Sequence, residues 1–208
     1  MLSVETVAAF VFAAYTLSLS PGPSNLYIMA CTMGSGGKGG LAAASGMAIG
    51  SLIYSVLTAI GVAAVIAVSP ALFLAIKLAG AAYLIYLGLI TLRDAHGPDF
   101  QKSVRRSAGA IWRQSVLVEL TNPKTVLFFL AFLPQFTTPG QGDEGLQLFL
   151  LGLIYSAVAL SSDLLVVGLS AKVKVILQRS PRLGVWQERA AGLVLLGLGL
   201  AIRAGELA

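Results

Sequence analysis

Long apolar stretches separated by short polar segments dominate the chain. They cover roughly residues 4–31, 41–68, 71–92, 115–136, 146–171 and 190–207. A helix needs about 20 residues to cross the hydrocarbon core of a bilayer, and most of these stretches reach that length. The pattern predicts six transmembrane helices and leaves no room for a separate soluble domain. We therefore expect an all-α polytopic membrane protein.

The composition agrees with this class. Of the 208 residues, 57% are apolar and 11% charged, and the mean hydropathy is +0.86. An average soluble domain has about 25% charged residues, so soluble globular and disordered chains are excluded. One cysteine and one histidine rule out an internal disulfide and argue against a Cys- or His-based metal site. We expect no cofactor, and no nucleic-acid partner because the basic residues are few. We expect no enzymatic activity because the motifs of common hydrolases are missing.

Most basic residues lie in three segments between the apolar stretches. They are Lys38, Arg93, Lys102, Arg105, Arg106, Arg113, Lys172, Lys174, Arg179, Arg182 and Arg189. With six spans these segments share one side, and the positive-inside rule places that side in the cytoplasm and both termini in the periplasm. Binding of anionic lipid headgroups is a second interpretation of the same charges. The first five residues include an acidic one, Glu5, and no basic one, so we expect no cleavable signal peptide.

Short sequences recur in the two halves of the chain in the same order. Leu-Ile-Tyr-Ser at residues 52–55 returns at residues 153–156, and the same offset of 101 aligns residues 20–23 with residues 121–124. We predict one membrane domain made of a three-plus-three repeat, about residues 1–92 and 115–208, joined by a basic loop at 93–114. Three is an odd number, so the second unit would be inverted, as in transporters that alternate access.

Proline and glycine interrupt the first and fourth apolar stretches. The breaks are Ser20, Pro21, Gly22 and Pro23 in the first stretch, and Asn122 and Pro123 in the fourth. The carbonyls that a proline frees must be buried in protein or line a cavity. We expect two broken helices, with Asn122 as an N-cap and proline at the first position of each new segment. Such helix starts attract anions, and Lys124 adds a positive charge, so a substrate carboxylate is the expected ligand. A kink without ligand contact is the alternative.

Two charged residues lie deep in the predicted spans. Lys124 is 11 residues from Arg113, and Asp163 is 9 residues from Lys172. At about 1.5 Å per residue, both lie near the middle of the bilayer. Charge at this depth is costly unless paired or hydrated, so both are candidates for substrate binding and proton coupling. Asp163 is expected to bind a substrate ammonium or a coupling proton and to pair with Lys124. A purely structural ion pair is the alternative.

Further polar side chains are candidates for ligand contact. Tyr54 and Tyr155 place hydroxyls in the second and fifth spans, and Asn25 follows the first break. Packing between helices is an equally good interpretation of the tyrosines. Glu119 lies only 6 residues from Arg113, so we expect its side chain to reach the cytoplasmic interface.

Small residues line one face of the second predicted span. Gly46 and Gly50 form a Gly-x-x-x-Gly pair, and Ala42 precedes them by one turn. Residues of this size at this spacing let two helices approach closely. We expect close packing at this face, either within the chain or against a second copy in a homodimer.

Four segments carry a distinctive combination of residues. They are Ser-Pro-Gly-Pro at 20–23, the glycines at 36, 40, 46 and 50, the segment 77–88, and Asn-Pro-Lys followed by the aromatic-rich segment 128–136. Together they resemble the LysE/RhtB family of bacterial amino-acid exporters over nearly the whole chain, with departures at Gln114 and Glu119. The resemblance implies a secondary exporter of amino acids or related metabolites that works by proton exchange.

A secondary active exporter in the bacterial inner membrane is the function that these features favour. Its expected partners are an amino-acid substrate, protons and the lipid bilayer. A passive channel, or an exporter of another small solute, is the alternative. Such a channel would need neither the midplane charges nor the inverted repeat.

Overall fold

The computed structural model describes residues 2–19, 22–93, 106–137 and 142–179, with short helical pieces between residues 185 and 200. The helices are α1 (Val4–Leu19), α2 (Pro23–Val68), α3 (Pro70–Arg93), α4 (Ala108–Leu120), α5 (Pro123–Leu127) and α6 (Glu144–Arg179). After α5 come a π-helical turn at Phe128–Phe132 and a 3-10 turn at Leu133–Phe136. No strand occurs in these described ranges, so the all-α expectation is confirmed for them.

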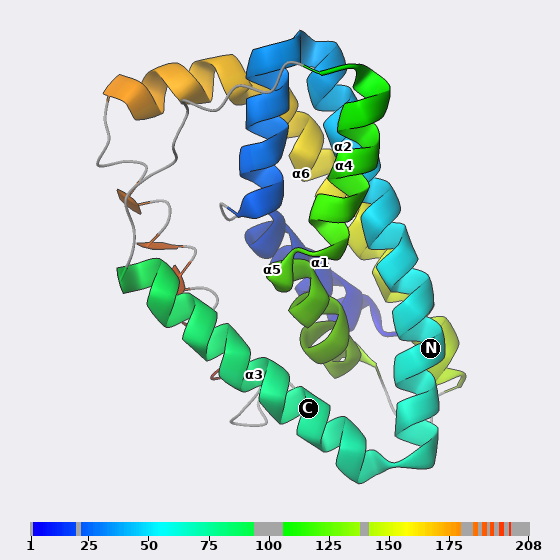
Figure 1. Cartoon of the computed structure of the whole chain (residues 1–208). Coiled ribbons are helices and arrows are strands. Elements are labelled where there is room, and N and C mark those ends of the chain that lie inside the picture. Colours follow the sequence, from blue (N-terminus) through cyan, green and yellow to red (C-terminus); the bar gives the residue numbers. More distant parts are fainter. Residues whose placement is uncertain are drawn as a thin grey trace.

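Two predicted spans are joined within α2. Residues 32–40 were expected to be a loop but are helical, except at Gly36, where the chain bends. Gly36 has φ 70° and ψ −171°, a conformation open essentially to glycine alone. In Figure 1, α2 turns over at this point and runs back along the molecule. The predicted turn is therefore a helical bend that depends on one glycine.

Helices α4 and α5 form one broken span with a bend of 48°. The carbonyls at the end of α4 have no partners within the helix and need other donors. The Thr121 hydroxyl donates to the carbonyls of Leu117 and Val118, and the backbone N–H of Asn122 donates to the carbonyl of Glu119. The carbonyl of Leu120 accepts from the Tyr54 hydroxyl at 2.5 Å. The predicted break is confirmed, and every carbonyl of the last turn of α4 has a donor.

Glycines set the close packing of α2 against α4 and α6. A Cβ placed on Gly46 would lie 2.5 Å from the carbonyl oxygen of Trp112, and one on Gly50 would lie 2.7 Å from the Cβ of Glu119. A Cβ on Gly152 of α6 would lie 2.6 Å from the Ser55 hydroxyl of α2. The Gly-x-x-x-Gly pair therefore packs within the chain, which decides between the two expectations.

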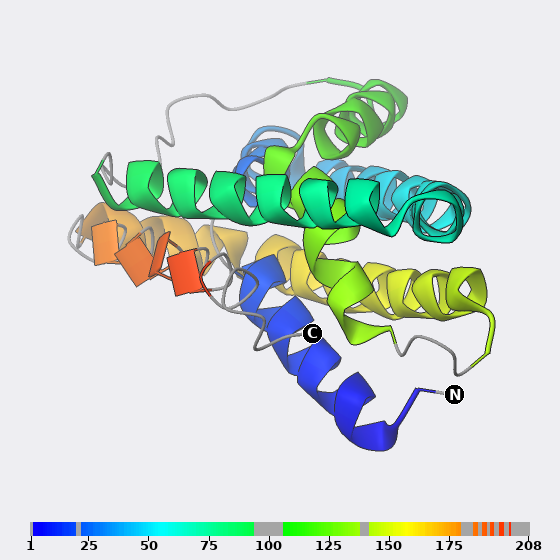
Figure 2. The ribbon, with the colours of Figure 1, turned by 90° about the horizontal axis from the view of Figure 1, so that it is seen from below.

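An aromatic cluster fills the lower half of this bundle. Phe10 of α1 and Phe128 lie 5.8 Å apart between ring centroids, and Phe128 stacks on Tyr155 of α6 at 4.1 Å. Phe129 stacks in turn on Tyr54 of α2 at 5.4 Å. The chain turns at the end of α2, and α3 then runs as one long straight helix (Figure 2). The cluster joins α1, α2 and α6 just below the α4–α5 break.

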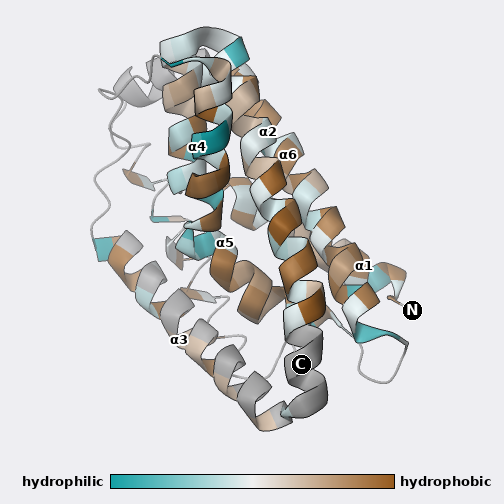
Figure 3. Ribbon diagram, turned by 45° about the vertical axis from the view of Figure 1, so that its right-hand side comes forward, coloured by the Kyte–Doolittle hydropathy of each residue, from teal (hydrophilic) through white to brown (hydrophobic). Residues whose placement is uncertain are grey.

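The described surface suits a bilayer. Pro23–Gly61 and Glu144–Ser170 are long and apolar enough to cross a membrane, and the bent α4–α5 pair gives a third such span if counted as one. α1 is a shorter apolar helix. Figure 3 shows mostly hydrophobic ribbon, interrupted by a hydrophilic stretch where α4 gives way to α5. The sixth predicted span, 190–207, lies largely outside the described residues.

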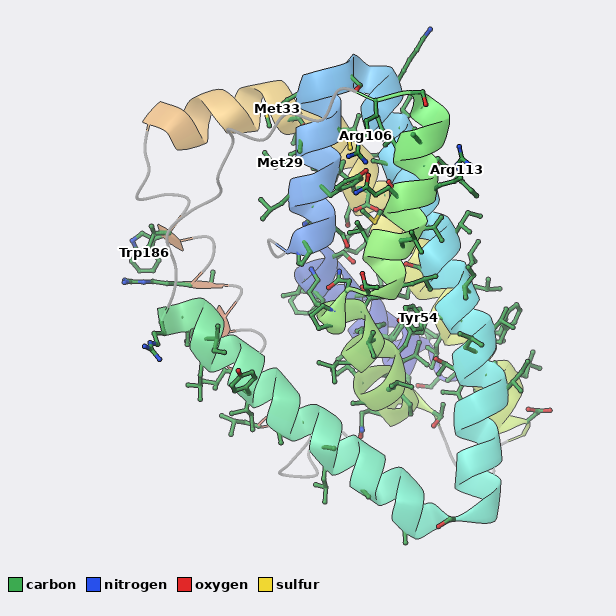
Figure 4. The ribbon with its side chains drawn as sticks, in the orientation of Figure 1. Met29, Met33, Tyr54, Arg106, Arg113 and Trp186 are labelled. Atoms are coloured by element: carbon green, nitrogen blue, oxygen red, sulfur yellow. The ribbon has the colours of Figure 1, made fainter. Side chains whose placement is uncertain are left out.

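The basic segment 106–113 lies at the same end of the molecule as the bend of α2, which carries Lys38. Arg106 and Arg113 lie where α2 bends (Figure 4). The Ser35 hydroxyl, beside the bend, accepts from the backbone N–H of Arg106 at 3.3 Å and donates to its carbonyl at 3.4 Å. In contrast to the predicted loop at 172–189, α6 stays helical through Arg179. Lysine and arginine are good helix formers, so the helix continues beyond the apolar stretch.

Candidate functional site

The two helix breaks and α6 enclose one polar cavity. It lies between the end of α1, the start of α2, the α4–α5 break and the middle of α6. Its lining residues are Ser18, Ser24, Asn25, Glu119, Asn122, Lys124, Thr125, Tyr155, Ala159 and Asp163. Residues from five helices, α1, α2, α4, α5 and α6, thus meet at one place inside an apolar bundle.

The α4–α5 break positions Lys124. Asn122 caps α5 as predicted, because its side-chain oxygen accepts from the backbone N–H of Lys124 at 3.0 Å, and Pro123 takes the first helical position. The Lys124 ammonium donates to the carbonyl of Leu17, the end of α1, at 3.0 Å. A Cβ on Gly22 would lie 3.2 Å from this ammonium nitrogen, so the absence of a side chain at residue 22 leaves room for it.

Asp163 brings a carboxylate to the same cavity from α6. Its side chain is buried, with 6% of its surface exposed. In the described ranges no residue forms a hydrogen bond or ion pair with this carboxylate. A buried carboxylate without a hydrogen-bond donor is costly inside a membrane protein, so Asp163 is a candidate for binding a cation or a proton. The expected direct pairing of Lys124 with Asp163 stays a prediction, although both line one cavity.

Glu119 was expected at the membrane interface, and this prediction is wrong. Its side chain is 4% exposed and lines the cavity. Counting residues from Arg113 gives the height of Glu119 along α4 but not the face of the helix that carries it. That face packs on Gly50 of α2, where hydroxyl groups donate to the carboxylate.

The remaining candidates divide into four groups. Tyr155 and Asn25 line the cavity, and the Asn25 amide donates to the carbonyl of Ser18 at 2.9 Å. Tyr54 is not a lining residue, since its hydroxyl binds the end of α4; Figure 4 shows it beside α5. Pro23 is exposed at the start of α2, with proline in the predicted first position. Ser20 and Pro21 lie outside the described residues.

Sequence reasoning missed the hydroxyl residues around the breaks. Ser24 and Thr125 both line the cavity and both bind Glu119. They are separated by the offset of 101 that relates the two breaks, so the repeat itself was a signal for them. Ser18 also lines the cavity, and its hydroxyl has no partner in the described part of the chain.

The cavity is small, with a volume of about 20 Å³. This is space for about one water molecule. An amino acid is larger, so its binding requires the surrounding helices to move apart.

A comparison with known families decides the class of this site. The sequence profile described as LysE type translocator matches residues 15–204. The chain belongs to the LysE type translocator family. The resemblance seen in the sequence is thereby confirmed, and the polar cavity lies within a membrane translocator.

Individual relatives of this translocator cover most of its length. A leucine efflux protein of Salmonella choleraesuis is 35% identical over 145 residues, which is 68% of each chain. A leucine efflux protein of Salmonella typhimurium shows the same identity and coverage. An uncharacterized membrane protein of Pseudomonas aeruginosa is 29% identical over 99% of this chain and 98% of its own. No solved structure matches the translocator.

Proposed function

We propose that this translocator exports neutral amino acids, leucine among them, across the bacterial inner membrane in exchange for protons. The observation that carries the proposal is the Asp163 carboxylate, which is buried in the cavity and accepts no hydrogen bond from the described residues. The relatives named leucine efflux proteins support the substrate class.

The cavity offers a complementary group for each end of an amino acid. Lys124 supplies a positive charge at the start of α2, where the free backbone N–H groups also favour an anion. Its positive charge attracts the substrate carboxylate. Asp163 supplies the negative charge for the substrate ammonium. The zwitterion therefore lies between Lys124 and Asp163.

Competition for Asp163 explains the coupling. A carboxylate in the middle of a membrane is costly unless it is neutralised. The substrate ammonium neutralises the Asp163 carboxylate on the outward step, and a proton neutralises it on the return step. Because both cannot occupy Asp163 together, each amino acid that leaves is exchanged for an entering proton.

The movement that opens the cavity follows from the repeat. We propose that the two halves form an inverted three-plus-three repeat and exchange conformations, which opens the cavity to each side in turn. The small cavity volume supports this proposal, since the described conformation has no room for leucine. The basic end with Arg106 and Arg113 then faces the cytoplasm.

Transport by purified protein in liposomes tests the proposal. With labelled leucine inside, acidifying the outside should accelerate efflux, and the rate should saturate with leucine concentration. Asp163→Asn should remove the response to the pH gradient, because an amide does not exchange a proton in this range. Asp143→Asn is the matched control. Asp143 caps the start of α6 outside the cavity through Leu146, and asparagine caps equally well.

Two results would overturn the proposal. Leucine flux that does not saturate and ignores the pH gradient would indicate a passive pathway. A response to the gradient that survives in Asp163→Asn would remove this residue from the coupling step.

A further inference from the structure

Three hydroxyl groups converge on the Glu119 carboxylate. Ser24 donates to one oxygen at 2.6 Å, while Ser51 and Thr125 donate to the other at 3.1 and 3.0 Å. These groups come from the start of α2, the middle of α2 and α5, so Glu119 connects three segments. This number of donors satisfies an ionised carboxylate, which accepts hydrogen bonds and donates none.

These bonds fix the direction of each hydroxyl. A hydroxyl has one proton, and when that proton points at Glu119 the oxygen offers only lone pairs to other groups. Ser24 confirms this direction, because its oxygen accepts from the Asn122 amide at 2.8 Å. Thr125 lines the cavity, and because its proton is used by Glu119, its hydroxyl can offer only lone pairs to a ligand there.

We propose that Glu119 is a positioning residue that turns the cavity hydroxyls into acceptors and thereby selects substrates with an ammonium group. Asp163 supplies the charge, and the oxygen of Thr125 supplies a second acceptor for the same ammonium. The inference rests on the proposed export of amino acids and assigns the part of the site that binds the substrate ammonium group.

A purely structural role explains less of the geometry. If Glu119 only held α2 and α5 together, its hydroxyl partners would not need to line the cavity. Both carboxylate oxygens, however, bind a hydroxyl that lines the cavity, Ser24 on one side and Thr125 on the other. Glutamine at this position must therefore point its amide N–H₂ at one of them, whichever way it is turned. The proton of that hydroxyl is then released toward other acceptors.

Glu119→Gln tests the inference, because it keeps the shape and changes only the hydrogen-bond direction. The measurement is inhibition of labelled leucine transport in liposomes by unlabelled leucine and by its deaminated analogue, 4-methylpentanoate. Wild type should prefer leucine. Glu119→Gln should lower this preference by about tenfold, the value of one lost hydrogen bond, with a smaller change in maximal rate. Thr125→Val should lower the preference in the same direction.

Controls separate this role from stability. Thr58→Val removes a buried hydroxyl outside the cavity that has no partner in the described part, so it should leave the preference unchanged. Glu119→Asp keeps the acceptor character and should retain more of the preference than Glu119→Gln. If Glu119→Gln fails to fold, Thr125→Val supplies the test.

The outcomes are distinct. An unchanged preference in Glu119→Gln and Thr125→Val overturns the inference while leaving amino-acid export intact. An equal loss of affinity for both compounds assigns Glu119 a structural role only. If wild type neither binds nor moves leucine, the proposed function fails, and the inference fails with it.

Discussion

The hydroxyl oxygens of Ser55 and Ser156 lie 3.4 Å apart, and these residues are separated by 101 positions in the chain. Each hydroxyl also donates at 2.9 Å to the carbonyl four residues before it, Ser51 and Gly152 respectively. The offset is the one at which Leu-Ile-Tyr-Ser recurs. A residue contacts its own repeat equivalent only near a two-fold axis, so this contact supports an axis between α2 and α6.

This axis predicts a cross-link that permits transport. If the repeats exchange conformations, the distance between a residue and its own equivalent is the same in both states. In a Cys31→Ser background, a disulfide between Ser55→Cys and Ser156→Cys should therefore retain most of the leucine flux. Cysteines at Tyr54 and Leu120, which are not equivalents, should block flux when joined by a short bifunctional reagent. Equal inhibition by both cross-links would contradict the repeat.

Close packing predicts a large difference between two glycine substitutions on α2. Gly46→Ala brings a methyl group to 2.5 Å from the carbonyl oxygen of Trp112, which the helix cannot move aside. We expect a loss of about 1–3 kcal/mol of stability, visible as a lower Tm in detergent. Gly61→Ala is the control, because nothing lies within 4 Å of its Cβ. Similar Tm values for the two variants would refute the packing assignment.

The helix breaks and two charged residues of the cavity were predictable because the signal is local. Proline removes a backbone donor wherever it stands, so the break at Asn122 and Pro123 follows from the sequence alone. Lys124 and Asp163 stood out because charge is rare in apolar spans. Their placement in one cavity also needed the way α6 packs on the breaks, which no local pattern contains.

The missed features depend on helix faces and on single backbone angles. Glu119 was misplaced because its burial depends on three hydroxyls from segments up to 95 residues away. The bend at Gly36 was taken for a loop because a glycine-rich stretch has low helix propensity, whereas packing keeps all but one of its residues helical. Both errors arise where tertiary contacts outweigh local preference.

Gly22 offers a way to displace Lys124 without unfolding the protein. In Gly22→Ala the new methyl group would lie 3.2 Å from the ammonium nitrogen, at the flexible end of the lysine side chain. The Tm should stay near that of wild type, while the KM for leucine should rise by about threefold to tenfold, since the ammonium shifts away from its position. Gly37→Ala, with nothing within 4 Å of its Cβ, is the control for KM and Tm. An unchanged KM would show that Lys124 does not bind the substrate carboxylate.

The Tyr54 hydroxyl predicts how the broken span is held. Tyr54→Phe keeps the stacking on Phe129 but removes the donor to the Leu120 carbonyl. Inside a membrane this carbonyl has no water to replace the donor, so we expect a loss of about 1–2 kcal/mol. Tyr15→Phe removes a hydroxyl that binds Ser161 at a partly exposed position, and its Tm should fall less.

Transport measurements on the same two variants extend this prediction. Leu120 follows Glu119 directly, so loosening the end of α4 moves the carboxylate that orients Ser24 and Thr125. Tyr54→Phe should therefore lower leucine flux at temperatures where the protein is still folded, and Tyr15→Phe should not. If leucine flux falls only as Tyr54→Phe unfolds, Tyr54 stabilises the break but does not position the cavity. The hydroxyls of Ser24 and Thr125 would then keep their direction even when the Leu120 carbonyl has lost its donor.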